Sequence, residues 1–150
     1  MRDKDFAAMI DSVTDGWKTA MGLHFVRATI DEVVAELEVS DVHRQPLGIV
    51  HGGVYAGMIE ATASVGASLN AMPDGKYAVG LDNHTSFLHA VREGKLRVTA
   101  HPVTRGRRSH LWDADVVDAK GRTVATGRVR LLVVDRGSQL GGEAAELRTR

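Results

Sequence analysis

The chain has 150 residues, of which 43% are apolar and 25% charged, as in an ordinary globular protein, and we expect one domain over 1–150. Its 19 basic residues balance its 19 acidic ones, which argues against a protein that binds nucleic acid. It has no cysteine, which excludes disulfides and thiolate chemistry and fits a cytoplasmic location, and no apolar run approaches the roughly 20 residues that span a membrane.

The first half of the chain predicts a helix, two strands and a second, longer helix. Apolar residues at helical spacing in 4–20 predict a short amphipathic N-terminal helix. The next two segments, 23–30 and 33–39, predict strands, and 41–51 has no apolar period and predicts a loop. The apolar run 53–71 is too long for a strand, and its Ala and Met residues favour a helix.

The second half predicts strands joined by short turns. The predicted strands are 77–91, 96–104, 110–118 and 122–135. Consecutive strands joined by tight turns pair antiparallel, and a helix that is apolar nearly all round must be buried. We therefore predict an α+β fold in which a curved antiparallel sheet of about six strands wraps a long central helix, with an N-terminal helix. The polar, Gly-containing segment 136–150 is expected to be a mobile tail.

Glu60 is the only Asp, Glu, Lys or Arg residue of the apolar segment 48–66. Its neighbours three and four positions away on a helix are small: Ala56, Gly57, Ala63 and Ser64. An apolar setting without a cation disfavours the ionised carboxylate and makes Glu60 a candidate acid, base or nucleophile. The alternative, an exposed Glu on a solvated helix face, is less favoured because this helix has no solvated face. The small neighbours would make room for a ligand.

His51, Gly52 and Gly53 stand where this helix is expected to begin. The first N–H groups of a helix lack internal partners and lie at the positive end of its dipole, and glycine lets a substrate approach them. Gly52 and Gly53 therefore predict a site that polarises a carbonyl, the alternative being a packing role alone. His51 is either a base or, as we favour, a structural residue that bonds to a loop carbonyl or to Gln45.

Two separated stretches resemble a known family. RQPLGIVHGGVYAGMIEATAS (44–64) and AVGLDNHTSFLHAVREGKLRV (78–98) are similar to the hotdog-fold acyl-CoA thioesterases of the phenylacetate-degradation type. The resemblance covers 23–134 and is closest to the branch with the Arthrobacter-type 4-hydroxybenzoyl-CoA thioesterase. It implies a single hotdog domain, an acyl-CoA substrate, no cofactor, no metal, and a homodimer that commonly pairs into a homotetramer.

The resemblance also implies catalytic roles, residue by residue. Glu60 matches the catalytic carboxylate, which acts as general base or nucleophile, and Gly52 matches the residue whose backbone N–H polarises the thioester carbonyl. Gln45 matches a polar loop residue near the thioester, and Ser64 matches a Ser or Thr that helps to hold the attacking water. In the family, the carboxylate comes from one subunit, whereas the residues matched by Gly52 and Gln45 come from the other.

This chain departs from many members of the wider family. Those members have Asn and Asp where it has Gln45 and Glu60, so the acyl group, aromatic or aliphatic, stays open. Arg107 and Arg108 fall where the family binds the CoA nucleotide, although other members often have small hydroxyl residues there. They are either phosphate ligands or a solvated basic turn.

The remaining candidates for substrate binding are His51, Gly53, Asn83 and Thr85. The polar residues Asn83 and His84 lie within a predicted strand, where they line the pocket or satisfy interface groups. Two rival functions stay open on the same fold. One is an enoyl-thioester hydratase or dehydratase with His51 and Glu60 as its acid–base pair. The other is a non-catalytic acyl-CoA sensor, which would have no use for Glu60.

Overall fold

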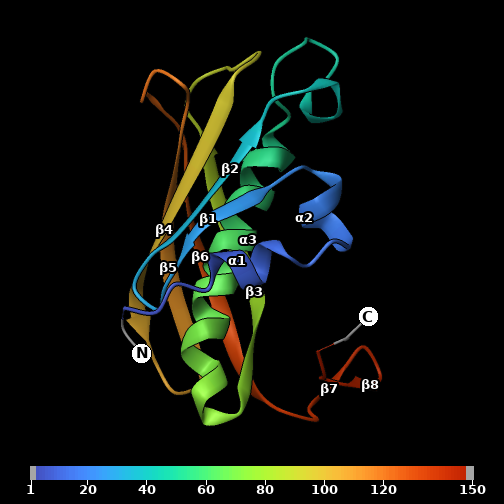
Figure 1. Ribbon diagram of the computed structural model, residues 1–150, viewed down its shortest axis with the longest axis vertical. Helices are drawn as coiled ribbons and strands as arrows, with labels where there is room; N and C mark the ends of the chain where they lie inside the picture. The colour runs from blue at the N-terminus through green and yellow to red at the C-terminus, as the bar shows by residue number, and fades with distance from the viewer. Residues whose placement is uncertain (1–2, 148–150) are drawn as a thin grey trace.

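The computed structural model describes residues 3–147, and its central feature is the long helix α3 (Gly52–Ala71) wrapped by one antiparallel sheet (Figure 1). The sheet has six strands in the order β1-β2-β4-β5-β6-β3. They are β1 (His24–Ala28), β2 (Val33–Glu38), β3 (Lys76–Phe87), β4 (Lys95–Arg105), β5 (Ser109–Val117) and β6 (Thr123–Asp135). The predicted α+β fold, with about six strands around a long central helix, is confirmed.

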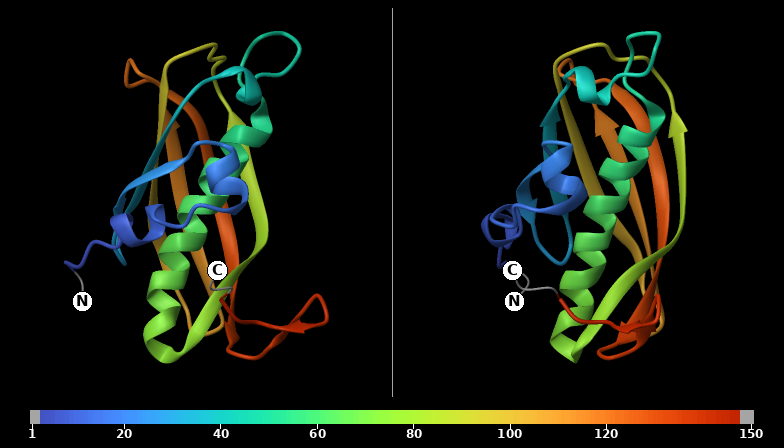
Figure 2. Two further views of the ribbon diagram at one scale, coloured as in Figure 1. Left: turned by 45° about the vertical axis from the view of Figure 1, so that its right-hand side comes forward. Right: turned by 90° about the vertical axis from the view of Figure 1, so that its right-hand side faces the viewer.

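Helix α3 lies along the concave face of the sheet (Figure 2), and the core consists of buried side chains from α3 and the strands. Met58 and Ile59 of α3 are fully buried, and so is Trp112 of β5. A Cβ atom at Gly66 would lie 2.3 Å from the Trp112 ring, so the absence of a side chain there lets the helix sit directly on the indole. Close packing of this kind fixes α3, and with it the residues that α3 carries.

The N-terminal segment differs from the prediction, because 4–20 forms two short helices in place of one. Between them the Asp11 carboxylate turns to β1, where it accepts a hydrogen bond from the backbone N–H of Phe25 (3.0 Å), and it also binds Lys18 Nζ (3.2 Å). The second helix then begins at Gly16, whose φ of 82° lies in the left-handed region that favours glycine. The apolar period of 4–20 did not reveal this break, and three residues of the pattern, Met9, Val13 and Trp17, are exposed. The two helices are α1 (Ala7–Asp11) and α2 (Gly16–Ala20).

The connecting segments contain short 3-10 turns, η1 (Asp41–His43) and η2 (Met72–Asp74). Of the expected mobile tail, residues 139–144 carry a small hairpin of β7 (Gln139–Leu140) and β8 (Glu143–Ala144), and residues 148–150 lie outside the described part of the chain. Within residues 3–147, no helix combines the length and the apolar character that crossing a membrane requires.

Strand β3 forms an open edge of the sheet, because it pairs with β6 alone. A bulge between Gly80 and Asp82 leaves Leu81 without a partner in the register. The strand ends at Phe87, earlier than the predicted 77–91. Leu81 is 56% exposed and Phe87 58%, so this edge presents apolar side chains as well as free backbone groups.

Candidate functional site

The carboxylate of Glu60, in the middle of α3, contacts polar groups from two elements. Its Oε2 accepts a hydrogen bond from Asn83 Nδ2 of β3 (3.0 Å), and its Oε1 accepts one from Ser64 Oγ, one turn further along α3 (3.4 Å). The same Asn83 nitrogen donates to the Ala56 carbonyl (3.0 Å), and the Thr85 hydroxyl donates to Asn83 Oδ1 (2.6 Å). Glu60 is half-buried, and its carboxylate has no cationic partner among the described residues. The expected apolar setting is thus corrected to an uncharged polar one.

The small residues around Glu60 are partly covered within one protomer. Ala63 is fully buried, and the Trp17 ring of α2 lies on Gly57, where a Cβ atom would be 2.2 Å from it. The close approach occurs at Gly80 of β3, where a Cβ atom would lie 2.2 Å from Glu60 Oε1. Gly80 is itself exposed at the open edge, whereas Glu60 is half-buried.

At the start of α3, the backbone N–H of Gly53 is occupied, and that of Gly52, just before it, is free. His51 is the N-cap, and its Nδ1 accepts a hydrogen bond from the Gly53 N–H (2.8 Å). The accepting Nδ1 carries no proton, so in the neutral ring the proton is on Nε2. Among residues 3–147, the Gly52 N–H donates to no other group. His51 thus caps α3 through the Gly53 N–H, where a loop carbonyl or Gln45 was the expected partner, and Gly52 offers the available donor.

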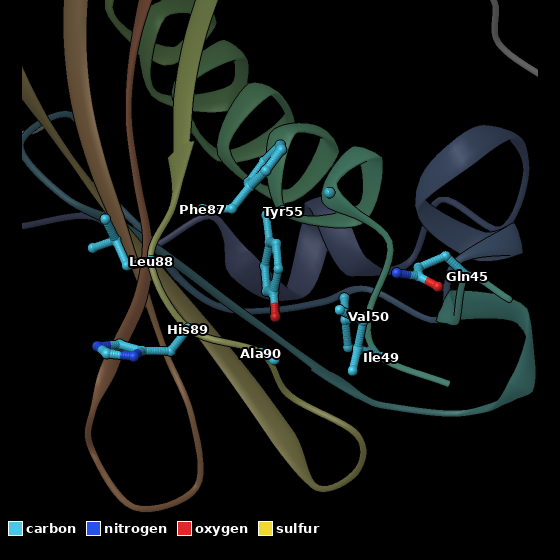
Figure 3. Close-up of a pocket in the computed structure, with 9 residues that line it drawn as sticks. Gln45, Ile49, Val50, Tyr55, Phe87, Leu88, His89 and Ala90 are labelled. Atoms are coloured by element: carbon cyan, nitrogen blue, oxygen red, sulfur yellow. The ribbon is translucent and has the colours of Figure 1, made fainter. Parts of the chain in front are cut away.

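A pocket of about 280 Å³ adjoins the free Gly52 N–H (Figure 3). The residues that line it are Gln45, Ile49, Val50, Gly52, Tyr55, Phe87, Leu88, His89 and Ala90. The Gln45 Oε1 accepts a hydrogen bond from the Leu47 N–H, which holds the loop, and the carboxamide nitrogen makes no hydrogen bond within the described residues. Gln45 and Gly52 thus line the same pocket.

Sequence reasoning missed Tyr55, whose side chain reaches from α3 into this group of residues (Figure 3). It is only 2% exposed, and its hydroxyl has no hydrogen-bond partner within residues 3–147. Burial raises the pKa of the Tyr55 hydroxyl, with a smaller contribution from the charge of Asp118. No sequence signal distinguishes Tyr55 from the other large residues of an apolar helix.

The two predicted halves of the site are separate within one protomer. Gly52 and Glu60 are eight positions apart on the same helix, which places them about 12 Å apart along its axis at ~1.5 Å per residue. One thioester carbonyl cannot contact both at hydrogen-bond distance. The structure therefore brings together Glu60 with Ser64, and Gln45 with Gly52, but not these two pairs with each other.

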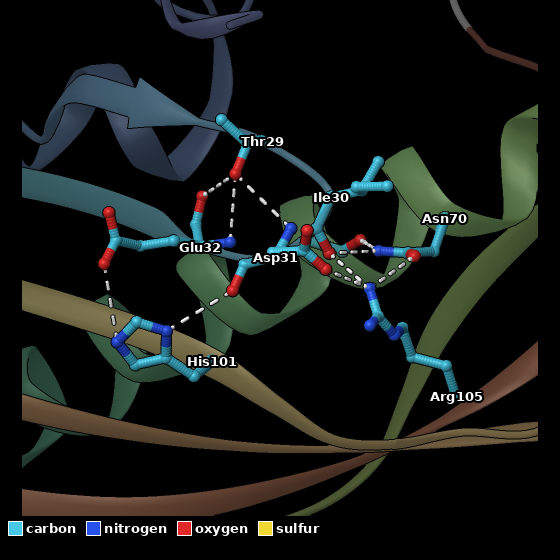
Figure 4. A network of polar contacts seen from close by, with 8 residues as sticks. Thr29, Ile30, Asp31, Glu32, Asn70, His101 and Arg105 are labelled. Carbon is cyan, nitrogen blue, oxygen red and sulfur yellow. Dashed lines mark hydrogen bonds and ion pairs between the residues drawn. The ribbon is translucent and has the colours of Figure 1, made fainter. Parts of the chain in front are cut away.

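Arg105, the last residue of β4, is held in a network of hydrogen bonds that joins three elements (Figure 4). Arg105 Nη1 donates to Asp31 Oδ1 (2.6 Å), to the Ile30 carbonyl (3.0 Å) and to Asn70 Oδ1 (3.3 Å). Asn70 in turn donates to the same Ile30 carbonyl (2.8 Å). Arg105 thus ties β4 to the β1–β2 turn and to the C-terminal end of α3, which is a structural role.

Arg107 and Arg108 follow in the turn between β4 and β5, and both are exposed. Their side chains form no hydrogen bond or ion pair within residues 3–147, and they line a hollow with Gly106 and Ser109. This turn and Gly52 lie at opposite ends of α3, whose 20 residues span about 30 Å (Figure 2). The structure therefore does not bring the two arginines to the Gly52 half of the site in the same protomer.

His110 of β5 is expected to make the protein less stable below about pH 6.5. The ring is 5% exposed and its Nδ1 has no partner within the described residues; burial lowers the pKa of His110, and the nearby Arg105 charge adds to this. Above that pH both states are neutral, but below it the unfolded chain takes up the proton first, so the free energy of unfolding falls until the lower folded pKa is reached.

Chemical denaturation between about pH 7.5 and pH 5 measures this effect of the His110 ring. His110→Gln should flatten the loss of stability over that range, while His84→Gln, at an exposed histidine, should not. An unchanged pH dependence in His110→Gln would show that the buried ring is not responsible.

Comparison with known proteins identifies the family. The sequence profile of the thioesterase superfamily matches residues 47–125. A protein of Mycobacterium tuberculosis named as an esterase, Rv1847, is 40% identical over 122 residues, which cover 80% of this chain and 87% of that protein. The proofreading thioesterase EntH of Cronobacter turicensis is 31% identical over 114 residues, covering 76% of this chain and 82% of its own.

Solved structures agree with the fold. The structure of the Mycobacterium tuberculosis protein superposes with a TM-score of 0.77 at 38% identity, covering 79% of this chain and 95% of that one. The thioesterase HI1161 of Haemophilus influenzae gives a TM-score of 0.81 at 26% identity, covering 89% and 94% of the two chains. The chain therefore belongs to the thioesterase superfamily: it is a thioester hydrolase with the hotdog fold.

Proposed function

We propose that the chain hydrolyses an acyl-CoA thioester to the carboxylic acid and free CoA, at a site composed of two copies of the chain. The observation that carries this proposal is the separation of two complementary half-sites on α3. One is the Glu60 carboxylate with Ser64; the other is the free Gly52 N–H with Gln45, about 12 Å away along the helix. A second copy would bring its own Gly52 to the first copy's Glu60.

Gly52 would supply the oxyanion donor. Its N–H is directed out of the first turn of α3, at the positive end of the helix dipole, and no described residue accepts from it. A donor that is already in place where negative charge develops on the thioester oxygen stabilises the transition state. The free carboxamide nitrogen of Gln45, at the same pocket, would orient the thioester.

Glu60 would either activate a water molecule or attack the thioester carbonyl carbon itself. As a general base it takes a proton from water while the water oxygen bonds to the carbonyl carbon; the C–S bond then breaks and the CoA thiolate receives a proton. As a nucleophile it forms an acyl anhydride with release of CoA thiolate, and water then hydrolyses the anhydride. Both routes use the same carboxylate, and the Ser64 hydroxyl beside it would help to hold the water.

The open edge at β3 supports the second copy. Its unpaired backbone groups and exposed apolar side chains at Leu81, Phe87 and Leu88 are the kind of surface that dimerisation covers. We propose a homodimer that pairs into a homotetramer. Arg107 and Arg108 have no side-chain partners within residues 3–147, and would bind the phosphates of a CoA held at another copy's site.

A panel of aromatic and aliphatic acyl-CoA thioesters tests the proposed function. We expect free thiol release, detected with a thiol reagent, from a subset of the panel, and this subset defines the acyl class. Loss of enoyl-CoA absorbance without thiol release would instead show the hydratase. That rival is disfavoured because His51 Nδ1 caps α3 and His51 is nine positions from Glu60. Binding without any turnover would indicate the sensor.

A further inference from the structure

We infer that Asn83, Gly80 and Thr85 of β3 position the Glu60 carboxylate, so that Oε1 is its reacting oxygen. This inference rests on the proposed function, in which Glu60 acts on the thioester. The sequence had suggested Asn83 and Thr85 as substrate-binding residues, but both side chains face this carboxylate network: Asn83 donates to Glu60, and Thr85 donates to Asn83.

Asn83 holds Oε2. Its Nδ2 donates one hydrogen to Glu60 Oε2 and the other to the Ala56 carbonyl, each at 3.0 Å. The second bond anchors the carboxamide to the turn of α3 that precedes Glu60, so that the donor and the carboxylate are held on the same piece of helix. Because the carboxamide is itself anchored, its hydrogen bond to Oε2 restricts rotation of the carboxylate group and fixes the carboxylate plane.

Thr85 supports the orientation of the carboxamide that its two acceptors require. The Glu60 carboxylate and the Ala56 carbonyl can only accept, so the NH₂ group faces them, and the Thr85 hydroxyl then donates to Asn83 Oδ1 at 2.6 Å. The carbonyl side of Asn83 is therefore turned to Thr85 and the NH₂ side to Glu60. The reversed carboxamide would place an acceptor against the carboxylate, which has no proton to donate when ionised.

Gly80 leaves the space in which Oε1 lies. A Cβ atom there would be 2.2 Å from Oε1, so any side chain would displace the carboxylate, and the bulge after Gly80 brings the exposed backbone of β3 to this position. Apart from this contact, Oε1 has only the long 3.4 Å bond from Ser64. The groups that face the carboxylate from α3 and β3 are all uncharged. Because Oε2 is already held by Asn83, Oε1 is the oxygen that can take a proton or attack.

Steady-state kinetics of Asn83→Ala and Asn83→Asp test the inference, with thiol release as the readout. We expect Asn83→Ala to lower kcat about 10-fold or more with KM little changed, because the carboxylate loses its alignment. The acid limb of the kcat–pH profile should move to higher pH, since the ionised form loses a donor. Asn83→Asp should move the limb further, because it places a second carboxylate against the first.

Two further variants test the other contacts in the same way. Thr85→Val should move the acid limb in the same direction as Asn83→Ala but less far, because Asn83 remains present. Gly80→Ala should lower kcat although every hydrogen-bonding group is retained, since the added methyl group occupies the position of Oε1.

Asn70→Ala is the matched control, because Asn70 also donates from its side chain to two backbone carbonyls but lies at the C-terminal end of α3, away from Glu60. It should lower stability and leave the pH profile of kcat unchanged. Folded Asn83, Thr85 and Gly80 variants with wild-type kcat and pH profile, alongside an inactive Glu60→Gln, would overturn this inference alone. An active Glu60→Gln would overturn the proposed function with it.

Discussion

Replacing Glu60 with Gln is expected to lower kcat for acyl-CoA hydrolysis by at least about 100-fold. The substitution keeps the length of the side chain and an oxygen that can accept from Asn83 Nδ2, so the packing of α3 against β3 should persist. What is lost is the group that takes a proton from water or attacks the thioester carbon. Thiol release at saturating substrate measures the effect, and thermal melting checks that the variant folds.

Glu36→Gln is the control variant, because it removes a carboxylate that lies away from the proposed site. Glu36 lies on β2 and pairs with Lys95 and Arg97, away from both half-sites, and exposed ion pairs of this kind contribute little. We expect kcat close to wild type. Near-wild-type turnover in Glu60→Gln as well would contradict the catalytic role of Glu60, whatever the acyl group.

Replacing Gly52 with Pro is expected to lower kcat/KM by about 10² to 10³, the effect of losing an oxyanion donor. Gly52 is the first residue of α3, where proline is well tolerated, and His51 before it has the extended conformation that a following proline requires (φ −66°, ψ 135°). Proline therefore deletes the N–H with little effect on the helix.

Gly52→Ala is the matched variant, because it adds a Cβ atom but keeps the N–H. In both variants that atom meets the Phe87 ring, 2.4 Å away, and Phe87 is 58% exposed, so its ring can turn aside. Alanine should therefore cost far less activity than proline. An equal loss in the two variants would assign Gly52 to packing against Phe87 and not to the thioester oxygen.

The sequence was most informative where the relevant contacts are local. Ser64 follows Glu60 by one helical turn, so their contact follows from helix geometry. The free N–H at Gly52 follows from its place at a helix start, although the sequence could not show that His51 takes the Gly53 N–H. The apolar period and the turn residues also predict the long helix, the order of the strands along the chain and their antiparallel pairing.

Contacts between distant segments could not be predicted. Asn83 lies 23 residues after Glu60, and the bulge at Leu81 changes which face of β3 its side chain occupies. An isolated Gly such as Gly80 suggests a bulge but does not say which side chains then face the helix. The same holds for Trp17, which covers the small-residue face at Gly57 that the sequence suggested was open. The break after Asp11 depends on hydrogen bonds to β1, which the apolar period of 4–20 does not contain.

The most direct test of the two-subunit site is to co-express Glu60→Gln and Gly52→Pro chains with different tags and to assay acyl-CoA hydrolysis. Each variant alone should be nearly inactive. If subunits assemble at random, about a quarter of the sites combine an intact Glu60 with the partner's intact Gly52, so we predict about a quarter of wild-type activity. Mixed oligomers, verified by native mass spectrometry, that show no recovery would contradict a site composed of two copies of the chain.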